Sequence, residues 1–383
     1  MPRPPHCVPQ VVEMPGAVYS PSGGRAVDAS LDACPLNVGD TWLEPFAGAR
    51  MEDLREASHP GLHRYSPTQG VPKLVDAIVD KLRDRNAQRC ERDSVLVCAG
   101  ATGALSCAVG ALTSPGEEVL ILAPFWPLIR GIVQTFRATP VEVPFYDRVD
   151  SSEAAVDAVR RRLTQKSVAL YVSTPSNPTG VVLPESWLAA LAELARSENL
   201  WLLSDEVYED YVYGDAEHVS MAQFAPERTL SVYSFSKAYG MAGNRTGYLV
   251  GPGEPVGQAG KISTHTFYCA PTAGQVAAKI ALADGGAWID RARSRYREVG
   301  KQAAEMLGLP APQGSTFLFF DASGVLDSRG IGGFLEDCLS DGVALAPGVS
   351  CGADYENWVR LCYTAAPPER VADAIAKVAK RLR

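Results

Sequence analysis

The segment SVYSFSKAYGMAGNRTG, residues 231–247, begins within an apolar run and ends in a group of polar side chains. The run from 229 to 235 predicts a buried strand that ends in Ser-Phe-Ser-Lys, and Arg245 lies eight residues beyond Lys237. Mostly parallel sheets present their chemistry at strand ends. Two hydroxyl groups, an amine and a guanidinium at such a place suit one anionic ligand that carries a carbonyl group. The segment therefore predicts a ligand site at the end of a sheet strand.

Similar apolar runs recur on both sides of this segment and alternate with helical patterns. They cover residues 94–100, 117–124, 168–174, 200–204, 229–235, 315–321, 343–348 and 357–363. This alternation is typical of an α/β fold. After Gln275 the pattern changes to long helices, which predicts the start of a smaller domain. Residues 1 to about 30 are rich in Pro, Gly and Ser, and we expect them to form an arm rather than an independent domain.

The composition indicates a globular protein with a large core. The chain has 383 residues and 46% hydrophobic content, enough for two domains. A formal net charge of −8 disfavours a nucleic-acid-binding surface. No apolar run reaches membrane-spanning length, and the first residues lack the apolar core of a secretion signal. The nine cysteines form no CxxC pair, so we expect a reduced cytoplasmic protein without a disulfide framework. We predict no metal site.

Polar residues also stand at the ends of other runs. Asp205 follows the run 200–204, where a carboxylate is costly unless it is paired. We expect its neighbour Glu206 to be solvated or structural. After the run 94–100, Ala101 and Thr102 open a helix of small residues. The N–H groups and the positive dipole end of a helix start suit a phosphate.

These segments resemble the class I/II aminotransferase family, whose members hold pyridoxal 5′-phosphate (PLP) on a lysine. The resemblance covers the chain from about residue 37 to the end, and it is carried by Asn177, Asp205, Tyr208, Lys237, Arg245 and Arg360 in that order. It implies the fold type I architecture: a mostly parallel seven-stranded sheet sandwiched by helices, with a smaller α+β domain. The implied divisions are an N-terminal arm (1–36) that contributes to the small domain, a large PLP-binding domain (37–275) and a small C-terminal domain (276–383).

The resemblance implies a role for each matching residue around the cofactor. Lys237 is expected to form a Schiff base with PLP and to move the substrate's α-proton. Asp205 is expected to keep the pyridine nitrogen protonated, so that the ring withdraws electrons from the α-carbon. With Tyr208, these are the predicted catalytic residues. The other implied cofactor contacts are Asn177 and Tyr208 at the phenolate oxygen, Trp126 stacked on the ring, and Ala101, Thr102, Ser234, Ser236, Arg245 and the neighbouring subunit's Tyr65 at the phosphate.

The same resemblance implies a substrate site and a homodimer with shared active sites. Arg360 lies inside an apolar run, where a charge needs a partner. In the family this arginine binds the substrate's α-carboxylate bidentately, and a structural ion pair is the alternative. Asn177 and the short loop at Gly39 are also expected to contact the substrate. Dicarboxylate-specific members place an arginine in the segment 261–274, where this chain has Thr264, with Lys261 and His265 nearby.

The function expected from these residues is transfer of an amino group from an α-amino acid to a 2-oxo acid. Other fold type I enzymes, namely lyases, synthases and oxidases that act on amino acids, use the same parts, because the cofactor performs the difficult chemistry. A second class is the aminotransferase-like sensor domain of some transcription regulators. Only about 35 residues precede the matching region here, too few for a DNA-binding domain. A dinucleotide-binding enzyme is disfavoured because the chain lacks the glycine-rich fingerprint.

Overall fold

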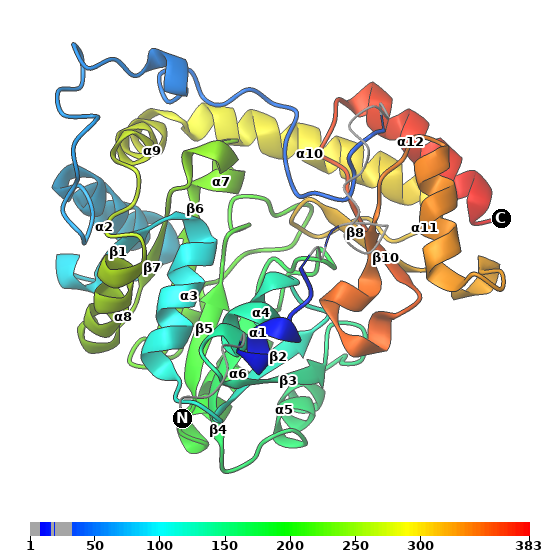
Figure 1. Cartoon of the computed structure of the whole chain (residues 1–383), viewed down its shortest axis with the longest axis horizontal. Coiled ribbons are helices and arrows are strands. Elements are labelled where there is room, and N and C mark those ends of the chain that lie inside the picture. Colours follow the sequence, from blue (N-terminus) through cyan, green and yellow to red (C-terminus); the bar gives the residue numbers. More distant parts are fainter. Residues whose placement is uncertain (1–7, 17–18, 20–32) are drawn as a thin grey trace, which may run out of the picture.

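The computed structural model describes residues 8–16, 19 and 33–383. Its largest element is a seven-stranded sheet in the order β1-β7-β6-β5-β4-β2-β3 (Figure 1). The strands are β1 (Val95–Cys98), β2 (Glu118–Ala123), β3 (Thr139–Pro144), β4 (Ser167–Ser173), β5 (Trp201–Asp205), β6 (Thr229–Ser234) and β7 (Gly247–Val250). The predicted mostly parallel seven-stranded sheet is confirmed.

The direction of the strands brings their carboxyl ends to one edge. Strands β3, β2, β4, β5 and β6 pair in parallel, whereas β7 runs antiparallel to both β6 and β1. In the register, Gly247 at the start of β7 pairs with Cys98 at the end of β1 and with Ser234 at the end of β6. The residues just before β7 therefore meet the carboxyl ends of its neighbours.

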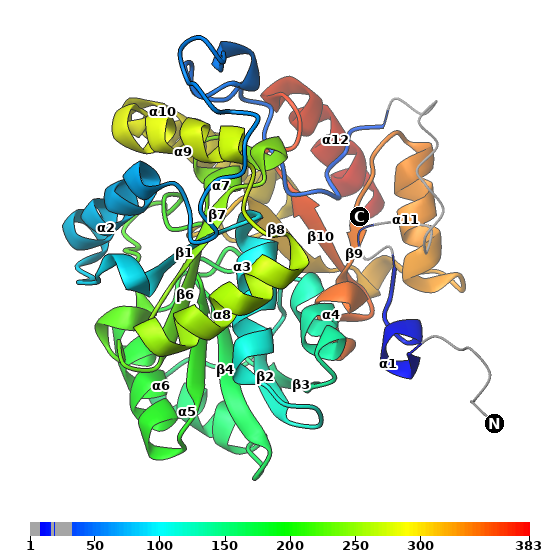
Figure 2. The same cartoon turned by 60° about the vertical axis from the view of Figure 1, so that its left-hand side comes forward.

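Helices cover both faces of this sheet (Figure 2). One face packs against α3 (Gly100–Leu112), α4 (Leu128–Thr135) and α8 (Gly253–Thr266), through a core that includes Leu105, Val109 and Leu249. The other face packs against α5 (Ser152–Arg160) and α6 (Glu185–Ser197), through a core that includes Leu188 and Leu202. Because both faces are buried, the strands are continuous apolar runs rather than alternating ones.

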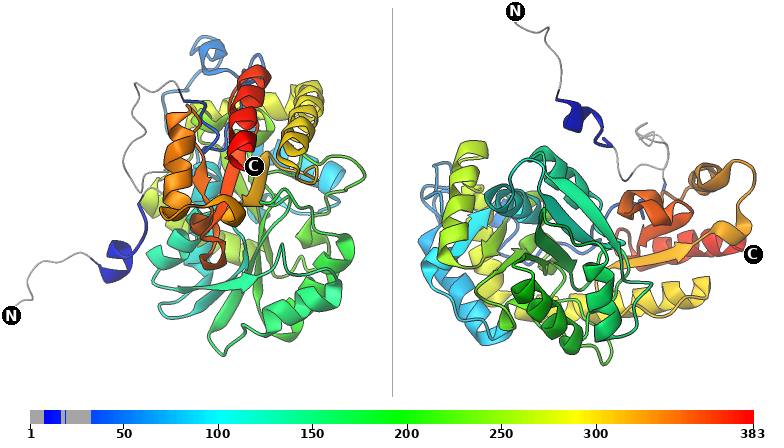
Figure 3. Two further views of the ribbon diagram at one scale, coloured as in Figure 1. Left: turned by 90° about the vertical axis from the view of Figure 1, so that its right-hand side faces the viewer. Right: turned by 90° about the horizontal axis from the view of Figure 1, so that it is seen from below.

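A second, three-stranded sheet lies toward the carboxyl terminus (Figure 3). Its order is β8 (Phe317–Asp321), β10 (Trp358–Cys362) and β9 (Ala346–Pro347), all antiparallel. The long helix α10 (Gly286–Leu307) lies in this region together with α11 (Gly330–Ser340) and α12 (Pro368–Arg381). Near α10 the chain forms α2 (Pro72–Asn86) and α9 (Thr272–Asp284), and the short helices are α1 (Pro9–Val12) and α7 (Phe235–Ala238).

The strand predictions differ from the structure in three places. Two strands of the large sheet, β3 and β7, have no counterpart among the predicted runs. The first is interrupted by Pro140 and ends at Pro144, and the second is only four residues long. The predicted run 343–348 contains only the two-residue strand β9. No helix within the described part of the chain is long and apolar enough to cross a membrane.

Candidate active site

A cavity of about 230 Å³ opens at the carboxyl edge of the large sheet. Among the sequence-predicted site residues, all except Tyr65 line it. They are Gly39, Ala101, Thr102, Trp126, Asn177, Asp205, Tyr208, Ser234, Ser236, Lys237, Arg245 and Arg360. The remaining wall is formed by Tyr19, Val38, Leu105, Val207, Ala242 and Phe317. Residues separated by more than three hundred positions therefore meet in one space.

Lys237 enters the cavity from α7, the short helix that follows β6. The side chain of Ser234 caps this helix by accepting the N–H of Ser236 at 3.1 Å. The ammonium of Lys237 donates to the carbonyl of Gly39 at 2.5 Å. Burial lowers the pKa of Lys237, because the charged ammonium is disfavoured away from water.

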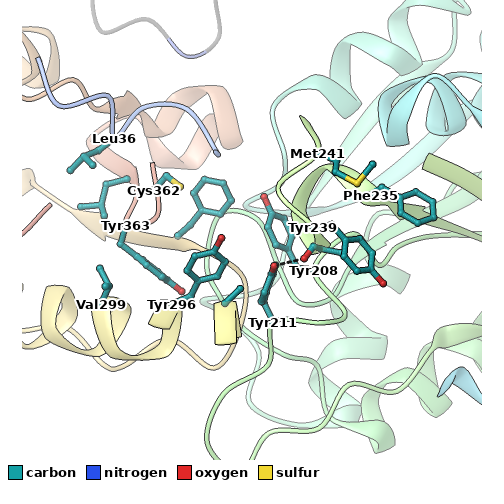
Figure 4. Close-up of a cluster of buried hydrophobic side chains, with 14 of the residues drawn as sticks. Leu36, Tyr208, Tyr211, Phe235, Tyr239, Met241, Tyr296, Val299, Cys362 and Tyr363 are labelled. Atoms are coloured by element: carbon teal, nitrogen blue, oxygen red, sulfur yellow. Dashed lines mark hydrogen bonds between the residues drawn. The ribbon is translucent and has the colours of Figure 1, made fainter. Parts of the chain in front are cut away.

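An aromatic cluster holds the backbone of this helix (Figure 4). The hydroxyl of Tyr211 donates to the carbonyls of Lys237 and Ala238, at 2.9 and 2.7 Å. Its ring packs edge-on against Tyr296 of α10, with centroids 5.0 Å apart. The position of Lys237 thus depends on packing between the helix α10 and the large sheet.

Asp205 is the last residue of β5 and is buried. Its Oδ2 accepts a hydrogen bond from the hydroxyl of Tyr171 at 2.6 Å, and its Oδ1 lies 3.4 Å from the N–H of Val207. Burial raises the pKa of this carboxyl to about 6, although the hydrogen bond from Tyr171 acts in the opposite direction. A carboxylate at this cavity wall is therefore ready to accept a hydrogen bond or a proton from a ligand.

Glu206 points away from the cavity and is structural rather than solvated. It is completely buried, and its oxygens accept hydrogen bonds from Ser204, Ser220, Ser231 and Tyr233 and contact the ring of His218. Burial alone raises the pKa of Glu206, but the hydrogen bond and charge of His218 and the serine hydroxyls outweigh it and lower that pKa.

Arg360 reaches the cavity from β10, where it is 1% exposed. Its guanidinium donates to the side-chain oxygen of Asn177 at 3.1 Å and to the carbonyl of Asn37 at 2.9 Å. The rings of Tyr19 and Phe317 flank it, each centroid 4.7 Å from the guanidinium carbon. The buried Nε of Arg360 has no hydrogen-bond partner among the described residues. Among the described residues no carboxylate is paired with this buried cation, and a structural ion pair is not seen there.

An anion cradle is formed where α3 begins beside Arg245. Ala101 and Thr102 lie in the first turn of α3, whose N–H groups and dipole favour an anion. Arg245 has a left-handed backbone (φ +50°), and its guanidinium donates to the carbonyls of Ala242 at 3.0 Å and Ala99 at 3.5 Å. Gly100 (φ +74°) leaves room for it, since a Cβ there would lie 2.5 Å from Nη2 of Arg245.

Two sequence-predicted positions lie away from the cavity wall. Tyr65 is 82% exposed, and its ring makes an edge contact with Tyr268, with centroids 4.9 Å apart. Thr264 lies in α8, where its hydroxyl donates to the carbonyl of Gly260 at 2.8 Å. Sequence reasoning did not identify Phe317 or Tyr171, because each lies within an apolar strand and carries no local polar signal.

The charges on the cavity wall contrast with those of the whole chain. Among the described residues that line the cavity, the cations are Lys237, Arg245 and Arg360 and the carboxylate is Asp205 alone, although the chain as a whole carries a formal charge of −8. Two of the cations are arginines, whose planar forks bind oxyanions well. The cavity therefore suits a ligand, or a pair of ligands, with more than one anionic group.

The chain resembles known proteins over most of its length. Residues 32–378 match the family model described as aminotransferase class I and II. The chain is 34% identical to a probable aspartate/prephenate aminotransferase of Thermus aquaticus, with 86% of each sequence covered. It is 31% identical to aromatic-amino-acid aminotransferase 2 of Thermococcus litoralis, with 87% of each covered. Among solved structures, the aspartate aminotransferase of Thermus thermophilus with maleate superposes with a TM-score of 0.87 at 30% identity, covering 98% of this chain and all of that one.

Proposed function

As a member of the aminotransferase class I and II family, this chain is a PLP-dependent aminotransferase, and we propose that its amino donor is an α-amino acid with an apolar or aromatic side chain. The acceptor is a 2-oxo acid. The observation that carries the proposal is the set of cations on the cavity wall, Lys237, Arg245 and Arg360. Each is assigned a separate task, and among the described residues that line the cavity no cation remains for a second substrate carboxylate.

The residues of the cavity fit PLP. The anion cradle of α3 and Arg245 suits a phosphate, and the small residue Gly100 keeps it open. We assign the phosphate to Ala101, Thr102, Ser234, Ser236 and Arg245. Trp126 would stack on the cofactor ring, Asp205 would pair with the ring nitrogen, and Asn177 and Tyr208 would contact the phenolate oxygen. When bound, PLP supplies an electron-withdrawing ring that stabilises negative charge at the substrate's α-carbon.

Lys237 is the residue that holds the cofactor and moves the proton. Burial lowers its pKa, so a larger fraction of the amine is neutral near pH 7 than for an exposed lysine. A neutral amine accepts the proton from the α-carbon, and the resulting ammonium returns it elsewhere. The carbonyl of Gly39, 2.5 Å from Nζ, orients the side chain toward the loop at residues 37–40.

Arg360 holds the substrate's α-carboxylate. Its orientation is fixed by Asn177 and the carbonyl of Asn37, and its unpartnered Nε adds a donor for an incoming oxyanion. Around it the wall is apolar and aromatic, formed by Tyr19, Val38 and Phe317. This wall favours an uncharged side chain. The family resemblance places Thr264 where dicarboxylate-specific members have an arginine, which agrees with that preference.

We further propose a homodimer in the cytoplasm, with residues 37–275 as the cofactor-binding domain and residues 276–383, joined by the arm 1–36, as the small domain. The exposed pair Tyr65 and Tyr268 supports an aromatic contact with a second subunit, whose phosphate site Tyr65 would complete. Buried free thiols at Cys98, Cys107 and Cys362 support a reducing compartment. Sedimentation of the purified protein tests the homodimer, and fractionation of its source cells tests the cytoplasmic location.

Two measurements test the proposed function. Steady-state assays with a panel of donors should give a kcat/KM for phenylalanine or tryptophan at least about tenfold above that for aspartate, since an unpaired buried carboxylate costs more than about 1.4 kcal/mol. A higher value for aspartate would overturn the substrate class.

The Lys237→Ala variant tests the assigned lysine. It should lose covalent attachment of PLP, measured by borohydride reduction and peptide mapping, and its turnover should fall at least roughly 10³-fold. Lys166→Ala, at an exposed lysine before β4, is the matched control and should behave like the unmodified enzyme. A reduced adduct on another lysine in Lys237→Ala would show that the assignment is wrong.

A further inference from the structure

The carboxylate of Asp205 has one strong hydrogen-bond donor in the described part of the chain, the hydroxyl of Tyr171. The two residues lie on adjacent parallel strands, β4 and β5, in which Ser173 pairs with Asp205. Tyr171 is completely buried, and its hydroxyl lies 2.6 Å from Oδ2 of Asp205. The N–H of Val207 is 3.4 Å from Oδ1, which is long for such a bond.

We propose that Tyr171 is a positioning residue, which holds Oδ2 of Asp205 so that Oδ1 is presented to the ring nitrogen of the bound cofactor. The proposal rests on the role assigned to Asp205 in the proposed function. It adds a residue that lines no part of the cavity wall and that acts on the cofactor only through the carboxylate.

The polar groups next to Asp205 already form hydrogen bonds with other partners. The hydroxyl of Tyr146 donates to the carbonyl of Ser173 at 2.6 Å and accepts its N–H at 3.1 Å. Glu206 takes its donors from the opposite side of β5, including Ser204 at 2.8 Å. Tyr146 cannot replace Tyr171 without breaking its own bonds, and the ionised Glu206 has no proton to donate. A buried carboxylate left without a donor is costly.

The hydrogen bond also has an electrostatic consequence. Burial raises the pKa of Asp205, whereas a donor to the ionised form lowers it. Among the described residues, the titratable groups that act on this carboxyl are Tyr146, Tyr171, Tyr208 and, through its charge alone, Glu206. The cations Lys237, Arg245 and Arg360 share the cavity wall with it. Removing the Tyr171 hydroxyl therefore leaves an acid that ionises only at higher pH, and an un-ionised Asp205 cannot stabilise a protonated ring nitrogen.

The test is a titration of the full-length apoenzyme with PLP, followed by cofactor fluorescence between pH 5 and 9. Tyr171→Phe should raise the PLP dissociation constant about tenfold at neutral pH, as expected for a lost bond to a charged group. The pH below which affinity falls should move up by about one unit. Tyr213→Phe is the matched control: this buried tyrosine donates to the backbone carbonyl of Ser315, at 2.7 Å, and the loss of its hydroxyl should move neither quantity.

Asp205→Asn separates this proposal from the one on which it rests. If Asp205→Asn binds PLP as tightly as the unmodified enzyme, the role of Asp205 itself is wrong. If Asp205→Asn is weakened and Tyr171→Phe is not, only the positioning role is wrong. In the Asp205→Asn background, Tyr171→Phe should cause no further shift in the pH profile.

A second variant decides the matter if Tyr171→Phe fails to fold, as judged by thermal unfolding. Replacement of Tyr171 by 3-fluorotyrosine keeps the ring and makes the hydroxyl a stronger donor. The pH below which PLP affinity falls should then move downward. An unchanged or upward shift would overturn the positioning role.

Discussion

Two adjacent carboxyl groups, Asp205 and Glu206, differ because β5 turns them toward opposite sides. Glu206 is surrounded by hydroxyl donors and His218, which lower its pKa and keep it ionised. Asp205 faces the cavity with one strong donor, and burial raises its pKa to about 6. The first group stabilises the fold. Asp205 can still accept a proton or pair with a cationic group. A carboxylate that binds a protonated cofactor ring requires this property.

This arrangement predicts that Asp205 destabilises the apoenzyme at neutral pH. Its pKa rises from 3.8 in the unfolded chain to about 6 in the folded one, so the folded state binds more protons between these values. Stability is therefore lost as the pH rises through 6, by up to about 3 kcal/mol. Asp205→Asn should raise the free energy of urea-induced unfolding of the apoenzyme by about that amount at pH 7.5, and the difference should vanish below pH 4. Asp290→Asn, at an exposed aspartate, is the control. If the Asp205→Asn apoenzyme is no more stable at pH 7.5 than the parent apoenzyme, this prediction is wrong.

At the scale of single elements, the cavity depends on how α3 leaves β1. The turn requires a left-handed residue, and Gly100 supplies it without a side chain. The same glycine lets the guanidinium of Arg245 lie against the backbone at the helix start. Two positive features, the dipole end of α3 and the side chain of Arg245, are thereby placed around one space.

Gly100→Ala should damage this anion cradle. A Cβ would lie 2.5 Å from Nη2 of Arg245 and would sit on a backbone with φ +74°, so both strain and displacement of the arginine follow. We expect the PLP dissociation constant to rise at least about tenfold and the free energy of unfolding to fall by about 1–3 kcal/mol. Both are measured on the purified variant.

Gly257→Ala is the matched control, because Gly257 lies within α8 with no heavy atom within 4 Å of the added Cβ. It should stabilise the protein by about 0.5–1 kcal/mol and leave PLP affinity unchanged. Equal PLP affinities for Gly100→Ala and the parent would show that the anion cradle does not bind the cofactor's phosphate.

The sequence predicts most of the site because the site is made at strand ends. Polar residues that follow apolar runs, such as Asp205, Asn177 and Lys237, are visible in the sequence, and parallel pairing carries them to one edge. Arg360 is visible as a charge inside an apolar run. Tyr171 is not, because a tyrosine in a buried strand has the same local pattern whether its hydroxyl donates to a backbone carbonyl or to a carboxylate on the cavity wall. Strand β3 is hidden because proline interrupts its apolar run.

At the scale of the whole molecule, the site joins parts that are distant in sequence. The loop 37–40, the large sheet and β10 all contribute, and the contacts of Arg360 with Asn37 and Asn177 tie them together. Tyr65 faces outward on the same chain. In the proposed homodimer, a second subunit would receive that side chain.

Hybrid dimers test this sharing of sites. Tyr65→Ala alone is expected to weaken activity, and Lys237→Ala alone is expected to abolish it. In a hybrid, one of the two sites receives an intact Tyr65 and an intact Lys237 from different subunits. Co-expression in equal amounts should thus restore roughly a quarter of full activity, since half of the dimers are hybrids with one complete site. If the mixture is only half as active as the same amount of Tyr65→Ala homodimer, Tyr65 acts within its own subunit.

The most direct test of the central claim is a half-reaction. The purified enzyme with bound PLP is mixed with a single amino acid and no 2-oxo acid, and the cofactor's visible absorption and the products are followed. The account predicts about one equivalent of the corresponding 2-oxo acid per site, no free ammonia, and the fastest conversion with an apolar or aromatic donor. Release of ammonia or another fragment over many turnovers, with the cofactor's starting spectrum restored, would contradict transamination and favour the lyase or oxidase alternative.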